Sequence, residues 1–247
     1  MQTNSLYTGM AGLQAITARM QAVATNLANQ QTSGFEAVQA LTEAANYQGA
    51  NAPAGADATV LTPGPDTMPG PLRHTGDPMN IAVSGDAWLQ VKTPAGTALT
   101  RDGALTISSA GILTDSSGNP VLNITGQPIN LPILAKLEIG SDGTISGVPA
   151  SSPGSAAQAY GQLNLVGTPT GTLTPLSGTL YMPPAGEVLR PAAQGSVAQG
   201  YLNDSNVDPT QSMMELIADS RSYQLQTEMM KTQSASSQDL NQMLASG

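Results

Sequence analysis

Residues that could perform catalysis are sparse in this sequence of 247 residues. His74 is the only histidine, and it follows Arg73 within a stretch rich in Pro and Gly. This context favours an exposed residue at the start of a strand over a catalytic residue. A Ser-His-Asp triad has no Gly-x-Ser-x-Gly element to support it, and neither a P-loop nor a dinucleotide-binding fingerprint occurs. The sequence therefore predicts no enzymatic activity and no cofactor.

Many acidic residues lie in sequence contexts that are typical of turns. Each of five aspartates lies beside Gly, Pro or Ser, namely Asp77, Asp86, Asp102, Asp115 and Asp142. Asp in such a context initiates turns through its own side chain, which explains the pattern better than paired catalytic carboxylates or calcium ligands. The chain has no cysteine, so disulfides and thiolate metal sites are excluded. We expect no metal site.

The composition indicates a protein that hides its surface in an assembly. Only 10% of residues are charged and 3% are aromatic, while 26 Gly and 18 Pro supply turns and extended segments. The net charge of −9 disfavours nucleic acid as a partner, because binding phosphate requires a basic surface. No apolar run approaches the length of a membrane span, and the N-terminus does not resemble a Sec signal peptide.

The first 35 residues predict a helix that needs a partner. Apolar or small side chains recur in alternating steps of four and three, which places them on one stripe of a helix over residues 3–29. The stripe consists of Leu6, Met10, Leu13, Thr17, Met20, Ala24 and Leu27. Arg19 is the only charged side chain here, so the usual charged outer face is missing. Gly9 and Gly12 permit a neighbour to approach the backbone closely.

A second helix is expected at the other end of the chain, from about Asp208 to Leu244. Asp208-Pro209 supplies an N-cap and a proline in the first turn. One stripe with helical spacing contains Met213, Leu216, Ser220, Tyr223, Thr227, Met230, Ser234, Ser237, Asn241 and Leu244, and another contains Met214, Ala218, Arg221, Leu225, Met229, Thr232, Ser236, Leu240 and Met243. One partner helix needs only one stripe, so two stripes favour contact with several neighbours.

The centre of the chain predicts a β-domain. From about Leu72, short apolar runs recur every 8 to 12 residues with Gly or Asp at each turn, which is typical of antiparallel strands. Trp88 is expected in the core of this domain. Residues 36–48 fit either a short helix or an extended arm, and Gly49 to Pro71 have the composition of a linker.

The predicted fold class is thus α+β. Long N- and C-terminal helices pack as an antiparallel coiled-coil-like pair, and an antiparallel all-β domain is inserted between them. The expected division is a helical domain of residues 1–35 and 206–247, extended linker or arm segments at residues 36–75 and 183–205, and the β-domain at residues 76–182.

Several motifs resemble those of the bacterial flagellar basal-body rod and hook proteins. The N-terminal family motif is ANNLAN followed by a spacer and SGF. This sequence matches it at Asn26, Leu27, Ala28 and Asn29, and then at Gly34 and Phe35, but has Thr25 in place of the first Asn. Leu99-Thr100-Arg101-Asp102-Gly103 is similar to the family's YTRDG element, with Leu99 in place of Tyr. Ser205-Asn206-Val207 resembles the lead of its closing helix. The short length and single compact insertion favour a rod subunit over a hook protein.

The resemblance implies a structural subunit that polymerises into the axial drive shaft of the flagellum and transmits motor torque across the periplasm to the hook. Its partners would be copies of itself, other rod proteins and the flagellar type III export apparatus, which would carry it out without a cleaved signal peptide. The helix-seam and subunit-packing residues would be Leu6, Met10, Leu13, Met20, Leu27, Met213, Leu216, Tyr223, Met230 and Leu244. The alternative is a secreted adhesin or carbohydrate-binding module with helical oligomerisation ends, against which the scarcity of aromatic residues counts.

Overall fold

The computed structural model describes residues 2–39, 42–46, 56–60 and 64–245. The chain divides into two compact units. The helical unit consists of Met1–Ala28, Val38–Pro63 and Asp208–Gly247, and the β unit consists of Asn29–Ala37 and Gly64–Val207. The fold is therefore α+β with a separate β domain, as the sequence predicts.

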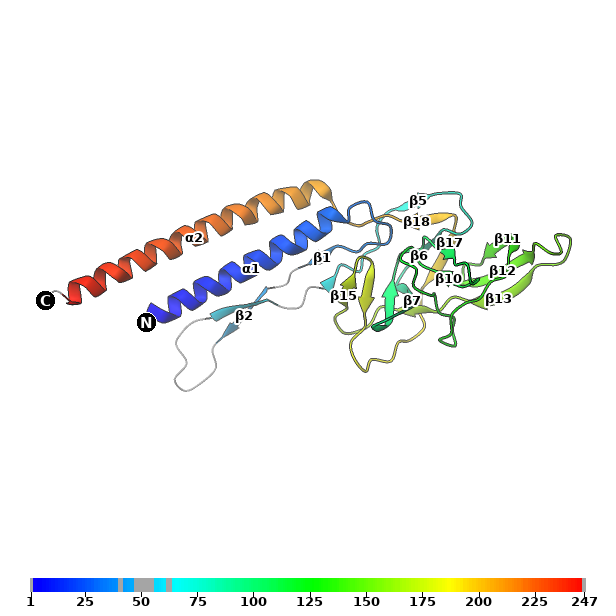
Figure 1. Cartoon of the computed structure of the whole chain (residues 1–247), viewed down its shortest axis with the longest axis horizontal. Coiled ribbons are helices and arrows are strands. Elements are labelled where there is room, and N and C mark those ends of the chain that lie inside the picture. The colour runs from blue at the N-terminus through cyan, green and yellow to red at the C-terminus, as the bar shows by residue number, and fades with distance from the viewer. Residues whose placement is uncertain (1, 40–41, 47–55, 61–63, 246–247) are drawn as a thin grey trace. The chain divides into compact units, whose positions relative to one another are not determined.

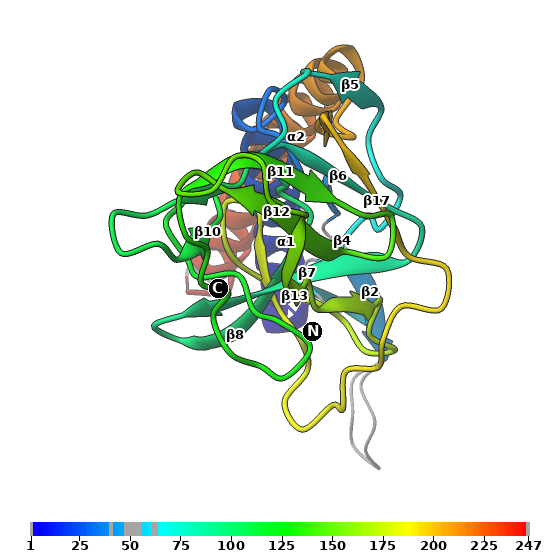
Figure 2. The ribbon, with the colours of Figure 1, turned by 90° about the vertical axis from the view of Figure 1, so that its right-hand side faces the viewer.

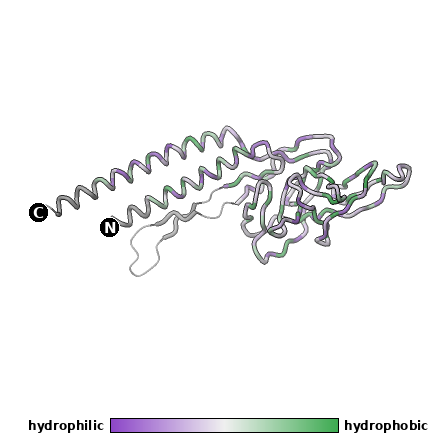
Figure 3. The backbone as a smooth tube through the Cα atoms, viewed as in Figure 1, coloured by the Kyte–Doolittle hydropathy of each residue, from purple (hydrophilic) through white to green (hydrophobic). Residues whose placement is uncertain are grey.

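Two long helices dominate the helical unit, α1 (Gln2–Ala28) and α2 (Pro209–Ala245). They lie side by side and run in opposite directions (Figure 1). The Asp208 carboxylate accepts hydrogen bonds from the backbone N–H groups of Thr210 and Gln211 at 2.8 and 3.1 Å, which confirms Asp208 as the N-cap. Figure 3 shows that apolar residues recur along both helices between polar ones, without a continuous apolar run.

Small residues and one ion pair form the contact between the helices. A Cβ atom at Gly9 would lie 3.3 Å from Cγ of Met230, and one at Gly12 would lie 3.4 Å from Nε2 of Gln226. The glycines of α1 therefore face α2. Arg19, the one charged residue of α1, pairs with the buried carboxylate of Asp219.

The rest of the helical unit is extended. It contains β1 (Val38–Gln39), β2 (Thr42–Asn46) and β3 (Ala56–Val60). β2 and β3 pair antiparallel with Thr42 opposite Val60, so the described part of residues 36–48 adopts the extended alternative. β3 also contacts α1. No alternating pattern in the sequence predicts β3, which lies inside the Gly-, Ala- and Pro-rich stretch.

The β unit contains fifteen short strands. They are β4 (Gly64–Pro65), β5 (Leu72–His74), β6 (Ile81–Ser84), β7 (Ala87–Thr93), β8 (Gly96–Thr100), β9 (Thr106–Ile107), β10 (Leu113–Thr114), β11 (Leu134–Ile139), β12 (Thr144–Pro149), β13 (Gln158–Gln162), β14 (Leu165–Gly167), β15 (Thr174–Ser177), β16 (Leu180–Met182), β17 (Ser196–Gln199) and β18 (Tyr201–Asn203). Their largest sheet has the order β14-β7-β8-β16-β15, and a second has the order β11-β12-β13. Figure 2 shows β11 and β12 side by side, and both sheets are antiparallel.

The two segments expected as extended linkers or arms supply strands to this unit. β17 pairs with β6 and β18 pairs with β5, so residues 196–203 are built into the β unit. Val197 and Leu202 are buried there, which explains why this Gly- and Pro-rich region is ordered against the strands. Each run is only three or four residues long, too short for a clear alternating pattern in the sequence.

The core of the β unit forms two clusters. The larger gathers aliphatic side chains from several strands, including Ile81, Leu89 and Ile145. The smaller contains Trp88, Leu99, Val166, Leu173 and Tyr181. Trp88 is fully buried, which confirms its predicted core position.

Candidate functional site: a buried junction in the β unit

The junction begins at the turn Gly34-Phe35, which follows α1 in sequence. Gly34 has a φ of +70°, and a Cβ atom there would lie 2.3 Å from the backbone nitrogen of Asp102. Only glycine combines this left-handed conformation with so close an approach. The Gly34 N–H donates to the carbonyl of Asn203 at 2.8 Å, and Phe35 is buried. The turn is thus fixed between two distant parts of the chain.

Glu36 and Arg101 form a buried ion pair at the centre of the junction. Arg101 Nη1 donates to Glu36 Oε1 at 3.0 Å, and both side chains are only 1% exposed. Arg101 also donates to three backbone carbonyls, those of Thr67 at 2.7 Å, Gly85 at 3.1 Å and Ala87 at 3.2 Å. Four hydrogen bonds compensate the guanidinium for the loss of water. The pair therefore ties three loops to one side chain.

Asn206 closes the junction from the segment that precedes α2. Its Nδ2 donates to Glu36 Oε2 at 3.0 Å and to the carbonyl of Met68 at 2.8 Å, while its Oδ1 accepts from the Ala37 N–H at 2.6 Å. Asn203 acts similarly, because its Oδ1 accepts from the Val83 N–H at 2.7 Å. Both asparagine side chains replace backbone pairing where the chain is irregular.

Aromatic rings cover the ion pair. The Arg101 guanidinium lies 4.4 Å from the ring centroid of Trp88, a cation–π contact, and Trp88 meets Tyr181 edge to face at 5.5 Å. The Tyr181 hydroxyl donates to the backbone carbonyl of Glu36 at 2.9 Å. Trp88 Nε1 donates to Thr168 Oγ1 at 3.1 Å, so the indole has no unpaired polar atom. These rings shield the junction from water.

Burial changes the protonation of the acidic groups. Desolvation raises the pKa of Glu36 from 4.5 to about 7, partly opposed by the charge of Arg101 and its hydrogen bond. Desolvation also raises the pKa of Asp102, opposed by the hydrogen bond from Ser116. Burial raises the pKa of the Tyr181 hydroxyl. In all three groups, burial thus favours the neutral form.

The arrangement suits mechanical attachment. Arg101 and Asn206 engage both Glu36 carboxylate oxygens, and the Tyr181 hydroxyl donates to the Glu36 backbone carbonyl. Among the described residues, no group of three or more His, Cys, Asp or Glu side chains could hold a metal ion. Likewise, no helix within the described ranges is long and apolar enough to cross a membrane. The junction fixes the two segments that connect the β unit to the helices.

The N-terminal motif residues have distinct positions. Asn26 is buried and exchanges two hydrogen bonds with the backbone of Val38, at 2.8 and 3.0 Å, within the helical unit. Leu27 is half-buried and Ala28 exposed at the end of α1. Asn29 Oδ1 accepts from Thr32 Oγ1 at 3.2 Å in the turn that leads to Gly34 and Phe35. Asn26 and Asn29 thus shape the exit from the helix.

The predicted seam residues differ in their burial. Leu13, Met20, Leu27, Leu216 and Met230 are half-buried, whereas Met10, Met213 and Tyr223 are exposed. The side chains of Leu6 and Leu244 lie outside the described residues. The most buried side chains of α1 are Ala15, Val23 and Asn26. Of the eight predicted seam residues whose side chains the structure describes, three are therefore exposed.

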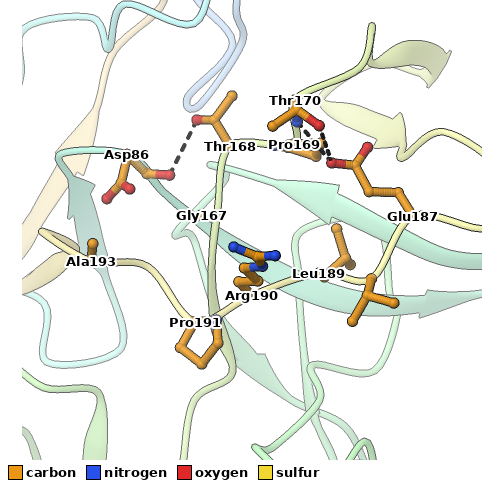
Figure 4. Close-up of a pocket in the computed structure, with 11 residues that line it drawn as sticks. Asp86, Gly167, Thr168, Pro169, Thr170, Glu187, Leu189, Arg190, Pro191 and Ala193 are labelled. Carbon is orange, nitrogen blue, oxygen red and sulfur yellow. Dashed lines mark hydrogen bonds between the residues drawn. The ribbon is translucent and has the colours of Figure 1, made fainter.

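A groove of about 660 Å³ opens elsewhere in the β unit (Figure 4). Segments 167–170 and 187–191 form its walls, and the Arg190 side chain points between them. Glu187 accepts hydrogen bonds from the N–H and hydroxyl of Thr170, which lowers its pKa. Asp86 accepts from the Gln194 N–H at 3.3 Å. The carboxylates of Glu187 and Asp86 thus stabilise the loops around the groove. The residues that line the groove do not form a catalytic arrangement.

Sequence reasoning missed Glu36 as the centre of the junction. It follows the Gly34-Phe35 turn directly and is one of few charged residues nearby, but the sequence does not reveal its partner 65 positions away. Arg101 and Asn206 lie in recognised motifs, although their common partner emerges only from the fold.

Comparison with known proteins defines the class. The family model described as "Flagellar hook protein FlgE/F/G D1 domain" matches residues 82–147, which include Trp88 and Arg101. The model described as "Flagellar basal body rod FlgEFG protein C-terminal" matches residues 198–243, which include Asn203 and Asn206. The chain belongs to the flagellar basal-body rod protein family.

Within that family, the chain is of the FlgF type. It is 32% identical over 250 residues to the flagellar basal-body rod protein FlgF of Escherichia coli, covering 98% of each chain. FlgF of Mesorhizobium japonicum is 31% identical over 249 residues, covering 96% of this chain and 95% of the relative. FlgG of Bacillus subtilis is 27% identical over 259 residues, covering 96% of this chain and 97% of the relative.

Proposed function

We propose that this chain is a structural subunit of the flagellar basal-body rod that polymerises through its helical unit and transmits motor torque to the hook. The observation that carries the proposal, beside membership of the family, is the exposed apolar surface of α2. Met214, Leu225 and Met229 are 60%, 68% and 65% exposed. A helix that exposes such side chains in the isolated chain needs partners to cover them.

α1 and α2 together act as an antiparallel, coiled-coil-like pair in this proposal. The glycine contacts and the ion pair of Arg19 with Asp219 align the helices within one subunit. The seam residues that stay half-exposed, such as Leu13, Met20 and Leu216, would meet neighbouring subunits. Methionine suits this position because its flexible side chain adapts to slightly different neighbours.

In this proposal the junction would carry torque into the β unit. Torque passes through an element only if its attachment resists bending, and the Glu36–Arg101–Asn206 network holds both connecting segments to the β unit. The partners would be copies of this chain and other rod proteins, including those above and below it. We further propose that the flagellar type III export apparatus secretes the chain without a cleaved signal peptide. The chain would then lie in the part of the basal-body rod that spans the periplasm.

Complementation tests the proposal directly. In a strain made non-motile by deletion of the gene, the full chain should restore swimming and appear as density in purified basal bodies. Met214→Glu combined with Leu225→Glu should abolish both, because the added charges prevent burial of the surface. The control is Gln224→Glu, which places the same charge at an exposed amide of α2. Loss of swimming in the control alone, or normal swimming in the double variant, would overturn the proposal.

A further inference from the structure

Methionines on the helices differ sharply in exposure. Met213, Met214 and Met229 are 50%, 60% and 65% exposed on α2. Met230, the next residue, is half-buried because its Cγ and Sδ atoms lie over Gly9 of α1. Met229 thus exposes its thioether to solvent, whereas the adjacent Met230 packs its thioether against α1.

We propose that Met213, Met214 and Met229 are separate oxidation-sensitive positions, at which reaction with hydrogen peroxide prevents the free subunit from assembling. Peroxide transfers one oxygen atom to the thioether sulfur as its O–O bond breaks. The sulfur loses two electrons and becomes a sulfoxide, and the second oxygen leaves as water with both protons. Oxidation converts a flexible apolar side chain into a polar one.

The consequence for assembly rests on the proposed function. The same three side chains contribute to the surface that neighbouring subunits are expected to cover. A sulfoxide in that contact must be desolvated without a matched donor, which opposes burial. Once the subunit is assembled, the neighbours exclude peroxide, so sensitivity is confined to the interval between synthesis and incorporation.

Oxidation rates test the chemistry on the purified full-length chain. After treatment with hydrogen peroxide, peptide mass spectrometry should show Met214 and Met229 oxidised about tenfold faster than Met230, since oxidation follows exposure. Met230 is the matched control because it shares the helix and the local sequence. Equal rates at Met229 and Met230 would overturn the proposal.

Motility tests the consequence. Met213→Gln, Met214→Gln and Met229→Gln combined imitate the polarity of sulfoxides and should stop swimming, whereas the three Leu substitutions should leave it normal. Ile124→Gln serves as the control, because Ile124 is 63% exposed but lies in the β unit. Normal swimming of the triple Gln variant overturns this inference alone. Normal swimming of the strain that lacks the gene overturns the proposed function instead.

Discussion

Arg101 donates a hydrogen bond of 3.0 Å to Glu36 across 65 positions of sequence, and neither side chain is exposed to water. This contact joins two motifs that look independent in the sequence, the turn after α1 and the Thr100-Arg101-Asp102-Gly103 element. Removing one partner of such a buried ion pair destabilises the fold, because the remaining charge is left without water around it.

Replacing Arg101 by Met should therefore destabilise the β unit by about 3–5 kcal/mol at pH 8, where the abandoned Glu36 carboxylate is charged in water. Denaturation followed by the fluorescence of Trp88, the only tryptophan, measures this free energy of unfolding and reports from the contact itself. Adding Glu36→Gln should recover part of the loss. If the two substitutions act additively, the pair is not energetically coupled.

Stability should also depend on pH through Glu36. Its pKa rises from 4.5 to about 7 on folding, so the folded state retains a proton that the unfolded state releases. The resulting stabilisation is fully present below pH 4.5 and is lost as pH rises through about 7, a decrease of about 3 kcal/mol from this group. Arg101 and Asp66 are the charged groups that act on it. The raised pKa of Asp102 acts in the same direction.

Denaturation midpoints between pH 4.5 and 8 measure this dependence. Glu36→Gln should flatten the profile, since the amide does not titrate. Asp142→Asn is the matched control, because Asp142 is exposed at a turn and its pKa is lowered. A wild-type profile that rises over this range would contradict the assignment.

Gly34 should tolerate no side chain. Alanine there must adopt a φ of +70° and place its Cβ atom 2.3 Å from the Asp102 nitrogen, so the backbone must move. Gly118→Ala is the control, because Gly118 has a φ of +84° but no atom within 4 Å of the added carbon. The control should cost about 1 kcal/mol, the strain of the left-handed conformation alone. Gly34→Ala should cost clearly more in chemical denaturation, and equal losses would exclude the close approach as the cause.

The sequence predicts long elements well and short ones poorly. The N-cap at Asp208 and the helical spacing after it suffice to place α2, because helix signals are local. β17 and β18 are three or four residues long and are held by pairing with β6 and β5, which no local pattern reveals. The junction follows the same rule. Gly34, Arg101 and Asn206 stand in recognisable motifs, but their convergence on Glu36 depends on the tertiary fold.

The helix contact offers a test in which two physical effects have opposite signs. Leucine favours an isolated helix over glycine by about 1 kcal/mol, so propensity alone predicts that Gly9→Leu stabilises α1. The Met230 side chain lies 3.3 Å from the position of the new Cβ atom, and overpacking costs about 1–3 kcal/mol. We expect the variant to lower the thermal midpoint of the circular dichroism signal at 222 nm.

Met230→Ala should rescue Gly9→Leu by vacating the space that the leucine needs. Thr17→Leu is the control, because Thr17 is exposed on α1 and the added methyl groups meet no partner in the isolated chain. Its midpoint should match that of the wild type or exceed it slightly. If Gly9→Leu raises the midpoint as much as Thr17→Leu does, the two helices do not pack through Gly9 in solution, and the antiparallel pair forms only with neighbouring subunits.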